Sequence, residues 1–335
     1  MHTEAQPAAP LHCDTVIVGG GAGGLELAAR LGRKFGAAAG PEKLLLIDRS
    51  IIHIWKPSLH EVAVGTLNPQ QEGLLYTALA QRNHFSFRLG ELCGLDPEAR
   101  TLDLAEWRDD EGVVVVPAMR IHFERCVLAI GSGSNSFGTP GFDKAFVLEN
   151  VEQAQRFHRH LFGRFLQAAN AEHRRLDVAI VGAGATGVEL AAEMTEAHRE
   201  FQTIVGRANR FALNIKLIEA APRILSALSE KMSAHAVNIL QDKQVEIFTS
   251  TQVGAIADHG IVTRSGQEIA ADIVVWAAGI KAAEANRHFG LQTNAIHQFI
   301  VNDRLQTSAP AVYAMGDCAA LEVQGVRVPA TAQAA

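Results

Sequence analysis

Two glycine-rich segments have the residue types and spacing that bind the pyrophosphate of a dinucleotide. The first reads Gly19-Gly-Gly-Ala-Gly-Gly24 and the second Gly182-Ala-Gly-Ala-Thr-Gly187, so both match G-x-G-x-x-G. The first glycine allows a tight turn, the second lets the backbone approach the phosphates, and the third lets helix and strand pack closely. Two motifs predict two dinucleotides, with electron transfer between them. The expected loop residues are Gly19, Gly21, Gly23, Gly24, Gly182, Gly184, Thr186 and Gly187.

An acidic residue follows each motif, at the end of the next apolar strand. Asp48 closes residues 44–47, and Glu219 closes residues 215–218. A carboxylate at this place accepts hydrogen bonds from an adenosine ribose. At Glu219 it would also repel a 2′-phosphate, so we expect NADH to be preferred over NADPH. Arg223 is near enough in sequence to soften that discrimination.

A further carboxylate, Asp317, ends the segment Tyr313-Ala-Met-Gly-Asp317 after a short apolar strand. Gly316 permits close backbone approach there, so the Asp317 carboxylate could bind the hydroxyl groups of a flavin. The same aspartate could instead cap the segment that begins at Cys318. The residues alone favour the capping role.

The elements around the motifs form one large repeat of strand, glycine loop, helix, strand and acid. The first copy is predicted at residues 14–18, 25–35 and 44–47, and the second at 176–181, 186–203 and 215–218. Further helices are expected at 74–81, 151–169 and 224–242. Further strands are expected at 85–88, 101–107, 113–116, 125–130, 245–249, 260–263, 273–277, 300–301 and 312–314.

This pattern predicts an α/β protein with two Rossmann-like dinucleotide-binding domains, the second inserted in the first. We expect a disordered tail over residues 1–13. Residues 14–140 and 292–335 would form an FAD-binding domain, and residues 141–291 an NADH-binding domain.

Composition excludes several other classes of protein. The 335 residues are 48% hydrophobic and 20% charged with a net charge of −6, which indicates a globular protein and disfavours nucleic acid as a partner. Neither a secretory signal nor a membrane-spanning run is present. The four cysteines form no C-x-x-C, which favours free thiols in a reducing compartment. No histidine spacing predicts a metal site, so His53 and His60 are expected to be packing or surface groups.

Four stretches of the chain resemble the two-dinucleotide flavoproteins of the glutathione-reductase fold, and among them the type II NADH:quinone oxidoreductases. Two stretches contain the glycine motifs, at residues 16–25 and 182–191. The more specific ones are His53-Ile-Trp-Lys-Pro-Ser-Leu-His-Glu-Val-Ala-Val-Gly65, and residues 313–317 continuing to Pro329-Ala-Thr-Ala-Gln333.

The resemblance implies a role for each candidate residue. FAD would be bound by the first loop, Asp48, the Ser132 region and Asp317, and NADH by the second loop and Glu219. Lys56 and Pro57 would lie near the flavin, Glu189 near both nicotinamide and flavin, and Gln333 on the quinone side. By itself, Glu189 fits better a carboxylate that favours a helix N-terminus. The expected catalytic residues are Glu189, Gln333 and Lys56, and the cofactor-binding set also includes Arg49, Gly131 and Gly279.

By the same resemblance, the expected activity is hydride transfer from NADH to FAD and transfer of two electrons to a membrane quinone, without proton pumping. Family members continue beyond the Ala-Gln motif into helices that hold the enzyme on the membrane. We therefore expect the anchoring region to be absent from this chain. The family location is peripheral, on the cytoplasmic side of the cell membrane, although this shorter chain could behave as a soluble protein. Monomer and homodimer both stay open.

Four other functions compete with this interpretation. A disulfide reductase needs a redox cysteine pair soon after the first unit, but residues 48–65 contain no cysteine. A sulfide:quinone reductase also needs paired cysteines, for which Cys126 and Cys318 are remote candidates. An NADH-dependent ferredoxin or rubredoxin reductase would use the same two nucleotides and stays open. So does a flavin-bearing redox sensor without rapid turnover.

Overall fold

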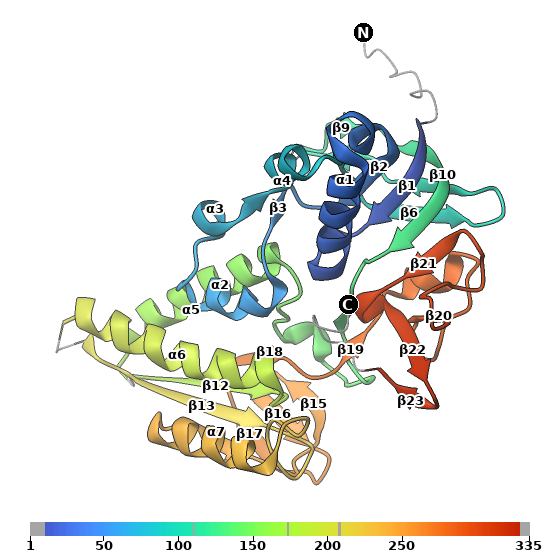
Figure 1. Ribbon diagram of the computed structural model, residues 1–335. Helices are drawn as coiled ribbons and strands as arrows, with labels where there is room; N and C mark the ends of the chain where they lie inside the picture. The colour runs from blue at the N-terminus through green and yellow to red at the C-terminus, as the bar shows by residue number, and fades with distance from the viewer. Residues whose placement is uncertain (1–10, 110, 173, 207–208, 329–335) are drawn as a thin grey trace. The chain divides into compact units, whose positions relative to one another are not determined.

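The computed structural model describes residues 11–109, 111–172, 174–206 and 209–328, and the chain divides into two compact units (Figure 1). Unit 1 comprises the described residues up to Trp55, Gly73–Gly133 and those from Lys281 onward. Unit 2 comprises Lys56–Glu72 and Ser134–Ile280. Both are α/β units, and the main body of unit 2 lies between segments of unit 1 in sequence, as predicted. The division falls at 133/134 and 280/281, whereas the sequence placed it at 140/141 and 291/292.

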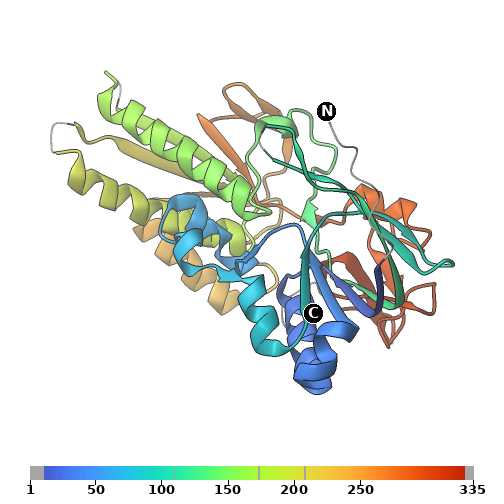
Figure 2. The ribbon, with the colours of Figure 1, turned by 90° about the horizontal axis from the view of Figure 1, so that it is seen from above.

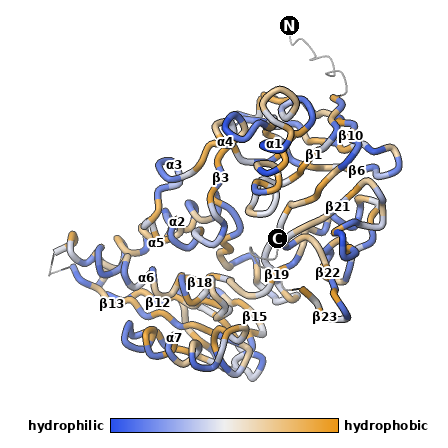
Figure 3. The backbone as a smooth tube through the Cα atoms, viewed as in Figure 1, coloured by the Kyte–Doolittle hydropathy of each residue, from blue (hydrophilic) through white to orange (hydrophobic). Residues whose placement is uncertain are grey.

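The sheet of unit 1 has the order β5-β2-β1-β10-β7-β6, and β21 also pairs with β10. Its inner strands are parallel, with Val18 of β1 opposite Leu128 of β10 and Ile47 of β2. The apolar runs of these strands are residues 16–18, 44–47 and 126–128, where both faces of the sheet are covered (Figure 3). The strands are β1 (Leu11–Val18), β2 (Leu44–Asp48), β5 (Ser86–Leu89), β6 (Leu92–Asp96), β7 (Thr101–Leu104), β10 (Met119–Leu128) and β21 (Val312–Ala314).

Alternate residues of β1 enter different cores of unit 1. Ile17 packs in a cluster with residues of α1 (Ala22–Lys43) and α4 (Tyr76–Asn83). Val16 and Val18 pack in another cluster, which includes Phe299 of β20 (Phe299–Val301). This period-2 alternation fixes the register, and it sets the strand ends that carry the glycine loop and Asp48.

The sheet of unit 2 has the order β14-β13-β12-β18, all parallel, with Val181 opposite both Ile218 and Trp276. Helices α5 and α6 run along this sheet (Figure 2). The sheet strands are β12 (Arg175–Val181), β13 (Ala212–Ile218), β14 (Glu246–Phe248) and β18 (Ile273–Trp276), and the helices are α5 (Val151–Asn170), α6 (Ala185–Ile204) and α7 (Glu230–Asp242). A second, antiparallel sheet contains β15 (Val253–Ala257), β16 (Gly260–Thr263) and β17 (Glu268–Ala270).

The smaller elements connect these layers. In unit 2, α2 (Leu59–Val64) packs against α5 and α6, and this packing places residues 56–72 in unit 2. The others are β3 (Ile52–His53), η1 (Lys56–Ser58), α3 (Pro69–Glu72), β4 (Leu74–Leu75), β8 (Trp107–Arg108), β9 (Val114–Val116), β11 (Gly133–Ser134), η2 (Phe142–Lys144), β19 (Ile280–Lys281), η4 (Glu284–His288), η5 (Gly316–Cys318), β22 (Ala319–Val323) and β23 (Val326–Arg327).

Three predicted boundaries at the N-terminal side of the chain were wrong. Strand β1 begins at Leu11, within the expected tail, because Leu11 to Cys13 pair with the long strand β10. Helix α1 does not end near residue 35 but kinks at Gly36, with φ +79°, and resumes to Lys43. The predicted strand 101–107 is two strands, β7 and β8.

Helix α7 begins at Glu230, six residues after the predicted start at residue 224. The Ser229 hydroxyl caps it by accepting a hydrogen bond from the Met232 N–H. Leu225, before the cap, has φ +48°, and its N–H donates to the carbonyl of Ala183 at 2.8 Å. That tertiary bond holds the segment outside the helix, which an apolar pattern alone does not indicate.

A charged pair within the body of unit 2 joins three of its strands. The Lys216 ammonium donates to the Asp177 carboxylate at 3.0 Å and to the Ala270 carbonyl at 2.7 Å. Only 10% of the Lys216 side chain and 14% of the Asp177 side chain are exposed. Burial acts to raise the pKa of Asp177, but hydrogen bonds from Arg175 and Lys216 hold it below its ordinary value.

Replacing Asp177 by asparagine should lower the free energy of unfolding at pH 7 by about 2 kcal/mol, because a buried ammonium loses its counter-charge. The Asp177 carboxylate stabilises the folded protein above the pKa that it has in the unfolded chain, near 4. This stabilisation is lost as pH falls through the lowered pKa of Asp177 in the folded protein. The difference between the variant and the natural protein should therefore shrink in acid. Urea unfolding at several pH values measures this, and a difference that does not change with pH would contradict it.

Candidate functional site

The two glycine motifs adopt the same local structure. Gly19 and Gly182 have φ values of +100° and +101°, which a side chain would strain. Their N–H groups donate to the last apolar residue of the neighbouring strand, Ile47 O at 2.7 Å and Ile218 O at 2.8 Å respectively. The tight turn that the sequence predicted is therefore present twice.

The third glycine of each motif touches the first. A β-carbon on Gly24 would lie 1.9 Å from the Gly19 carbonyl oxygen, and one on Gly187 would lie 1.9 Å from the Gly182 oxygen. No L-residue with a side chain fits at that distance without moving the backbone. Helix and strand consequently approach as closely as the motif requires.

The middle glycines, by contrast, face open space. Gly21 caps the N-terminus of α1 and Gly184 that of α6, and a β-carbon on either would meet no atom within 4 Å. The first turn of each helix lacks acidic residues. Unpaired N–H groups at a helix start bind phosphate. Each loop therefore has the room and the donors that a dinucleotide pyrophosphate needs.

The two acids hold the glycine loops as well as ending their strands. Asp48 accepts from the Gly20 N–H at 2.6 Å with one oxygen and from the Ser50 N–H at 2.8 Å with the other. Glu219 accepts from the N–H groups of Ala183 and Ala221, both at 2.8 Å. Each carboxylate oxygen keeps a second lone pair with which to bind a ribose hydroxyl.

Arg223, which the sequence placed near Glu219, holds its own turn. Its guanidinium donates to the carbonyl oxygens of Leu225 at 3.2 Å and Ser226 at 2.8 Å. These bonds engage both terminal nitrogens of the guanidinium within the turn before α7.

Asp317 and Ser132, which the resemblance assigns to FAD, meet in unit 1. The Ser132 hydroxyl donates to the Asp317 carboxylate at 3.0 Å. The side-chain amide of Gln298, which is 1% exposed, donates to the Asp317 carbonyl at 2.7 Å. Gly131, with φ +69°, turns the chain between β10 and Ser132. Gln298 was not found from the sequence, because nothing in its local pattern distinguishes it.

Buried thiols near this carboxylate are poorly suited to redox chemistry. Burial raises the pKa of Cys318 to about 11 and that of Cys126 to about 12. All four cysteines are free, and the Cys318 thiol donates to main-chain carbonyls of Leu128 and Met315. Because the thiolate is the reactive form, neither residue provides a nucleophile at neutral pH.

Within unit 2, His60 connects Glu189 to the turn that contains Lys56 and Pro57. The His60 Nδ1 lies 2.7 Å from the Pro57 carbonyl and 3.6 Å from a carboxylate oxygen of Glu189. Glu189 stands near the start of α6, and burial raises its pKa although His60 acts to lower it. Lys56 is exposed in η1. His60 therefore makes polar contacts with the Pro57 carbonyl and with Glu189, and it is not only a packing residue.

The remaining expected residues have simpler environments. Arg49 is exposed directly after Asp48, Gly23 stands in the first turn of α1, and Thr186 is exposed in the first turn of α6. Gly279 has φ +64°, and its carbonyl accepts from the Asn135 N–H at 3.3 Å. Gln333 lies outside the described residues.

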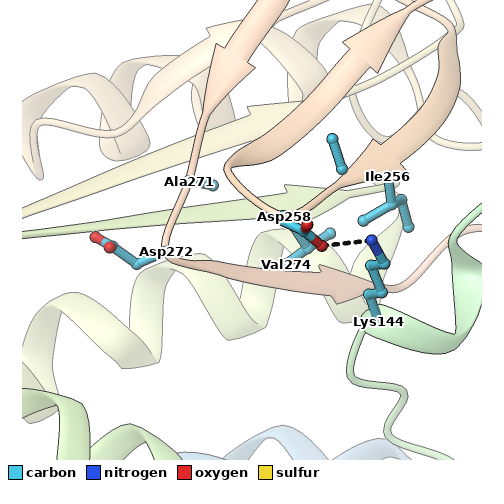
Figure 4. Close-up of a pocket in the computed structure, with 7 residues that line it drawn as sticks. Lys144, Ile256, Asp258, Ala271, Asp272 and Val274 are labelled. Carbon is cyan, nitrogen blue, oxygen red and sulfur yellow. Dashed lines mark hydrogen bonds and ion pairs between the residues drawn. The ribbon is translucent and has the colours of Figure 1, made fainter.

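A pocket elsewhere in unit 2 contains none of the expected site residues. The Lys144 ammonium pairs with Asp258 at 2.5 Å at its edge, and Asp272 points away from that pair (Figure 4). Both partners are substantially exposed, so the pair contributes little to stability. Its lining residues are Lys144, Ile256, Ala257, Asp258, Ala271, Asp272 and Val274.

Two further observations concern the part of the chain that the structure describes. It contains no cluster of three or more histidine, cysteine or acidic side chains arranged to hold a metal ion. None of its helices combines the length and the apolar character needed to cross a bilayer.

Comparison with known proteins agrees with this geometry. Residues 13–335 match the family model of the pyridine nucleotide-disulphide oxidoreductases. The chain is 38% identical to a type II NADH:quinone oxidoreductase of Haemophilus influenzae, over 96% of this chain and 77% of that protein. A relative of the same name in Staphylococcus saprophyticus is 29% identical, over 96% and 78%.

Solved structures share the fold at lower identity. An NDH2 from Plasmodium falciparum in complex with NADH matches with a TM-score of 0.77 at 20% identity, covering 92% of this chain and 64% of that one. A ferredoxin reductase from Rhodopseudomonas palustris matches with a TM-score of 0.73 at 21% identity, covering 96% and 73%. Family membership indicates FAD and NAD(H) as the two dinucleotides. With its paired glycine loops, this chain belongs to the type II NADH:quinone oxidoreductases, within the pyridine nucleotide-disulphide oxidoreductase family.

Proposed function

We propose that this chain oxidises NADH through FAD and passes two electrons to a membrane quinone, without pumping protons. The observation that carries the proposal is the duplicated site. Two loops of equal geometry, each with its own acid and open phosphate space, stand in one chain of this family. One loop alone would fit a simple dehydrogenase, whereas two fit an electron-transferring flavoprotein.

We assign FAD to unit 1 and NADH to unit 2. In unit 1 the N–H of Gly21 would bind the pyrophosphate and Asp48 the adenosine ribose, while Asp317 with Ser132 would bind flavin hydroxyls. In unit 2 Gly184 and Glu219 would take the corresponding roles for NADH. When bound, the flavin accepts hydride from NADH and releases electrons to quinone, and the protein supplies binding and orientation.

Our proposals for the electron acceptor and the cellular location are supported by the family of the chain. Relatives are named for quinone, and we propose quinone here, with Gln333 as a quinone-side residue and Lys56 and Pro57 as residues beside the flavin. We place the protein peripherally on the cytoplasmic face of the cell membrane. Either a monomer or a homodimer is compatible with this proposal.

One measurement tests the function directly. The purified protein should be yellow, should bleach when NADH is added without oxygen, and should recover its flavin absorbance when a soluble quinone is added. Absence of flavin would overturn the proposal. Recovery with ferredoxin but not with quinone would assign the chain to the ferredoxin reductases, and slow recovery with every acceptor would indicate a redox sensor.

We propose Glu189 as a group that holds a proton during quinone reduction, because its half-exposed carboxylate lies 3.6 Å from the Nδ1 of His60 and its partial burial raises the pKa of the carboxyl. Changing Glu189→Gln should lower the turnover with quinone by about tenfold or more, since the variant cannot release a proton. In the natural protein, the turnover with quinone should decline as pH rises through the raised pKa of Glu189, because the carboxyl then loses its proton. The variant should not show this decline. A variant whose pH profile matches the natural one would contradict the assignment.

A further inference from the structure

Two side chains from outside the first glycine motif converge on one of its carbonyl groups. The Tyr76 hydroxyl donates to the Gly20 carbonyl oxygen at 2.6 Å. The Nδ1 of His53 lies 3.0 Å from the same oxygen and 3.3 Å from the tyrosine hydroxyl. A carbonyl oxygen only accepts, so His53 carries its proton on Nδ1 when it makes this bond. The Gly20 carbonyl is thereby held by two donors, all within unit 1.

Fixing this carbonyl also fixes the next N–H. A trans peptide is planar, so the Gly20 carbonyl and the Gly21 N–H point in opposite directions. With the oxygen held toward Tyr76, the Gly21 N–H is turned away from Tyr76. Gly21 is the position where an added β-carbon would meet no atom within 4 Å. Polarisation of the carbonyl by its two donors also strengthens the N–H as a donor.

In the second motif, the corresponding carbonyl is held by a backbone N–H group. Its second residue is Ala183, whose N–H donates to Glu219 as that of Gly20 donates to Asp48. The Ala183 carbonyl accepts from the Leu225 N–H at 2.8 Å. Both loops therefore combine an acid on the N–H of the second residue with a donor on its carbonyl. In unit 1 that donor is a pair of side chains, and in unit 2 it is the main chain.

The identity of the second residue agrees with this difference. A β-carbon on Gly20 would lie 2.5 Å from the Tyr76 hydroxyl and 2.6 Å from its ring, so glycine is required there. At the corresponding place in the second motif the residue is Ala183, and among the described residues its carbonyl accepts from the Leu225 N–H and from no side chain. The second residue of each motif is therefore one that leaves room for the group that donates to its carbonyl.

Burial and ring stacking hold the Tyr76 side chain in this position. It is 3% exposed, and its ring stacks on Phe87 with centroids 4.9 Å apart. Burial raises the pKa of its hydroxyl and lowers the pKa of His53, so both groups are neutral donors near pH 7. Asp48, whose charge also faces both groups, acts on Tyr76 in the same direction as burial.

We propose that Tyr76, assisted by His53, is a positioning residue for FAD, because it orients the Gly20–Gly21 peptide so that its N–H faces the pyrophosphate. This inference rests on the proposed function, which assigns FAD to the first loop. It adds two residues from outside the motif to the machinery that binds the cofactor. It also predicts that their effect is confined to one of the two nucleotides.

The test is Tyr76→Phe, which removes the hydroxyl and keeps the ring on Phe87. The dissociation constant of FAD, measured by the flavin fluorescence released on dilution of the holoenzyme, should rise by about five- to twentyfold. The affinity of the same holoenzyme for NAD⁺ should not change, because Leu225 holds the second loop. A loss of affinity for both nucleotides would indicate only general destabilisation and would overturn the proposal.

Thr307→Val is the matched control. The Thr307 hydroxyl is buried in unit 1 and donates to the Val312 carbonyl at 2.8 Å, apart from the glycine loop. This variant should keep the natural FAD affinity, and an increase in the FAD dissociation constant equal to that of Tyr76→Phe would overturn the proposal.

Gly21→Val separates the inference from the function on which it rests. If this variant retains FAD with natural affinity, FAD does not bind at the first loop, and the proposed assignment fails together with the inference. If Gly21→Val loses FAD but Tyr76→Phe binds it as tightly as the natural protein, the assignment stands and the positioning role of Tyr76 is wrong.

Discussion

Valine in place of Gly184 should lower the rate of NADH oxidation by about 100-fold or more while the protein keeps its FAD. The space in front of Gly184 is open, and a valine side chain would occupy it. A pyrophosphate held there accepts charge-assisted hydrogen bonds, each of which contributes about 1.5–3 kcal/mol. Loss of two such bonds corresponds to about 3–6 kcal/mol, and 1.4 kcal/mol is about a tenfold change in affinity.

Gly21→Val, the matched variant in unit 1, should give the opposite pattern. It should purify with little flavin and still bind NAD⁺, because the two loops stand in separate units. Flavin content by absorbance and NAD⁺ affinity by titration measure the two properties independently. If both variants lost the same nucleotide, the assignment of FAD to unit 1 and NADH to unit 2 would be wrong.

Much of the fold was predictable from the sequence because the informative signals are local. The apolar run at residues 176–181 is confirmed as β12, and the turn into α6 begins where glycine was expected. The glycines at 19 and 182 have the positive φ that their motif requires. Strands β16 and β21 have the predicted bounds. These features depend on neighbours in sequence, which a pattern records.

Features that depend on distant contacts were missed. Residues 56–72 follow the first βαβ unit, but α2, in which Leu59 and Val62 are buried, packs against helices from the later part of the chain. The start of α7 is delayed by a bond from Leu225 to the glycine loop. No local pattern encodes the partner of either segment, so sequence reasoning placed the first in the wrong unit and started the second too early.

In the candidate site, too, local motifs could be predicted from the sequence and contacts between distant residues could not. The motifs predicted Gly21, Asp48 and Glu219, and the two acids hydrogen-bond to the glycine loops, whereas the hydrogen bond between Ser132 and Asp317 was not predicted. Tyr76 and His53 were not identified, because a tyrosine or histidine far from a motif carries no sign of which carbonyl it contacts. The role of Gln333 stays a prediction, since that residue lies outside the described part of the chain.

Alanine in place of Gly187 should lower the free energy of unfolding by about 3 kcal/mol or more, although alanine is the better helix former. Its β-carbon would lie 1.9 Å from the Gly182 carbonyl oxygen, a backbone atom that cannot rotate away. The helix would have to move off β12, which opens the core between them. Urea unfolding monitored by circular dichroism measures the loss.

Gly163→Ala is the control that makes this result specific. Gly163 lies inside α5 of the same unit, and a β-carbon there would meet no atom within 4 Å. That substitution should raise the free energy of unfolding by about 0.5–1 kcal/mol through helix propensity alone. The same chemical change should thus have opposite signs at two helical glycines of one unit. If both variants were stabilised, the close contact between α6 and the Gly182 turn would not be a feature of the folded protein, and the third glycine of the motif would have no packing role.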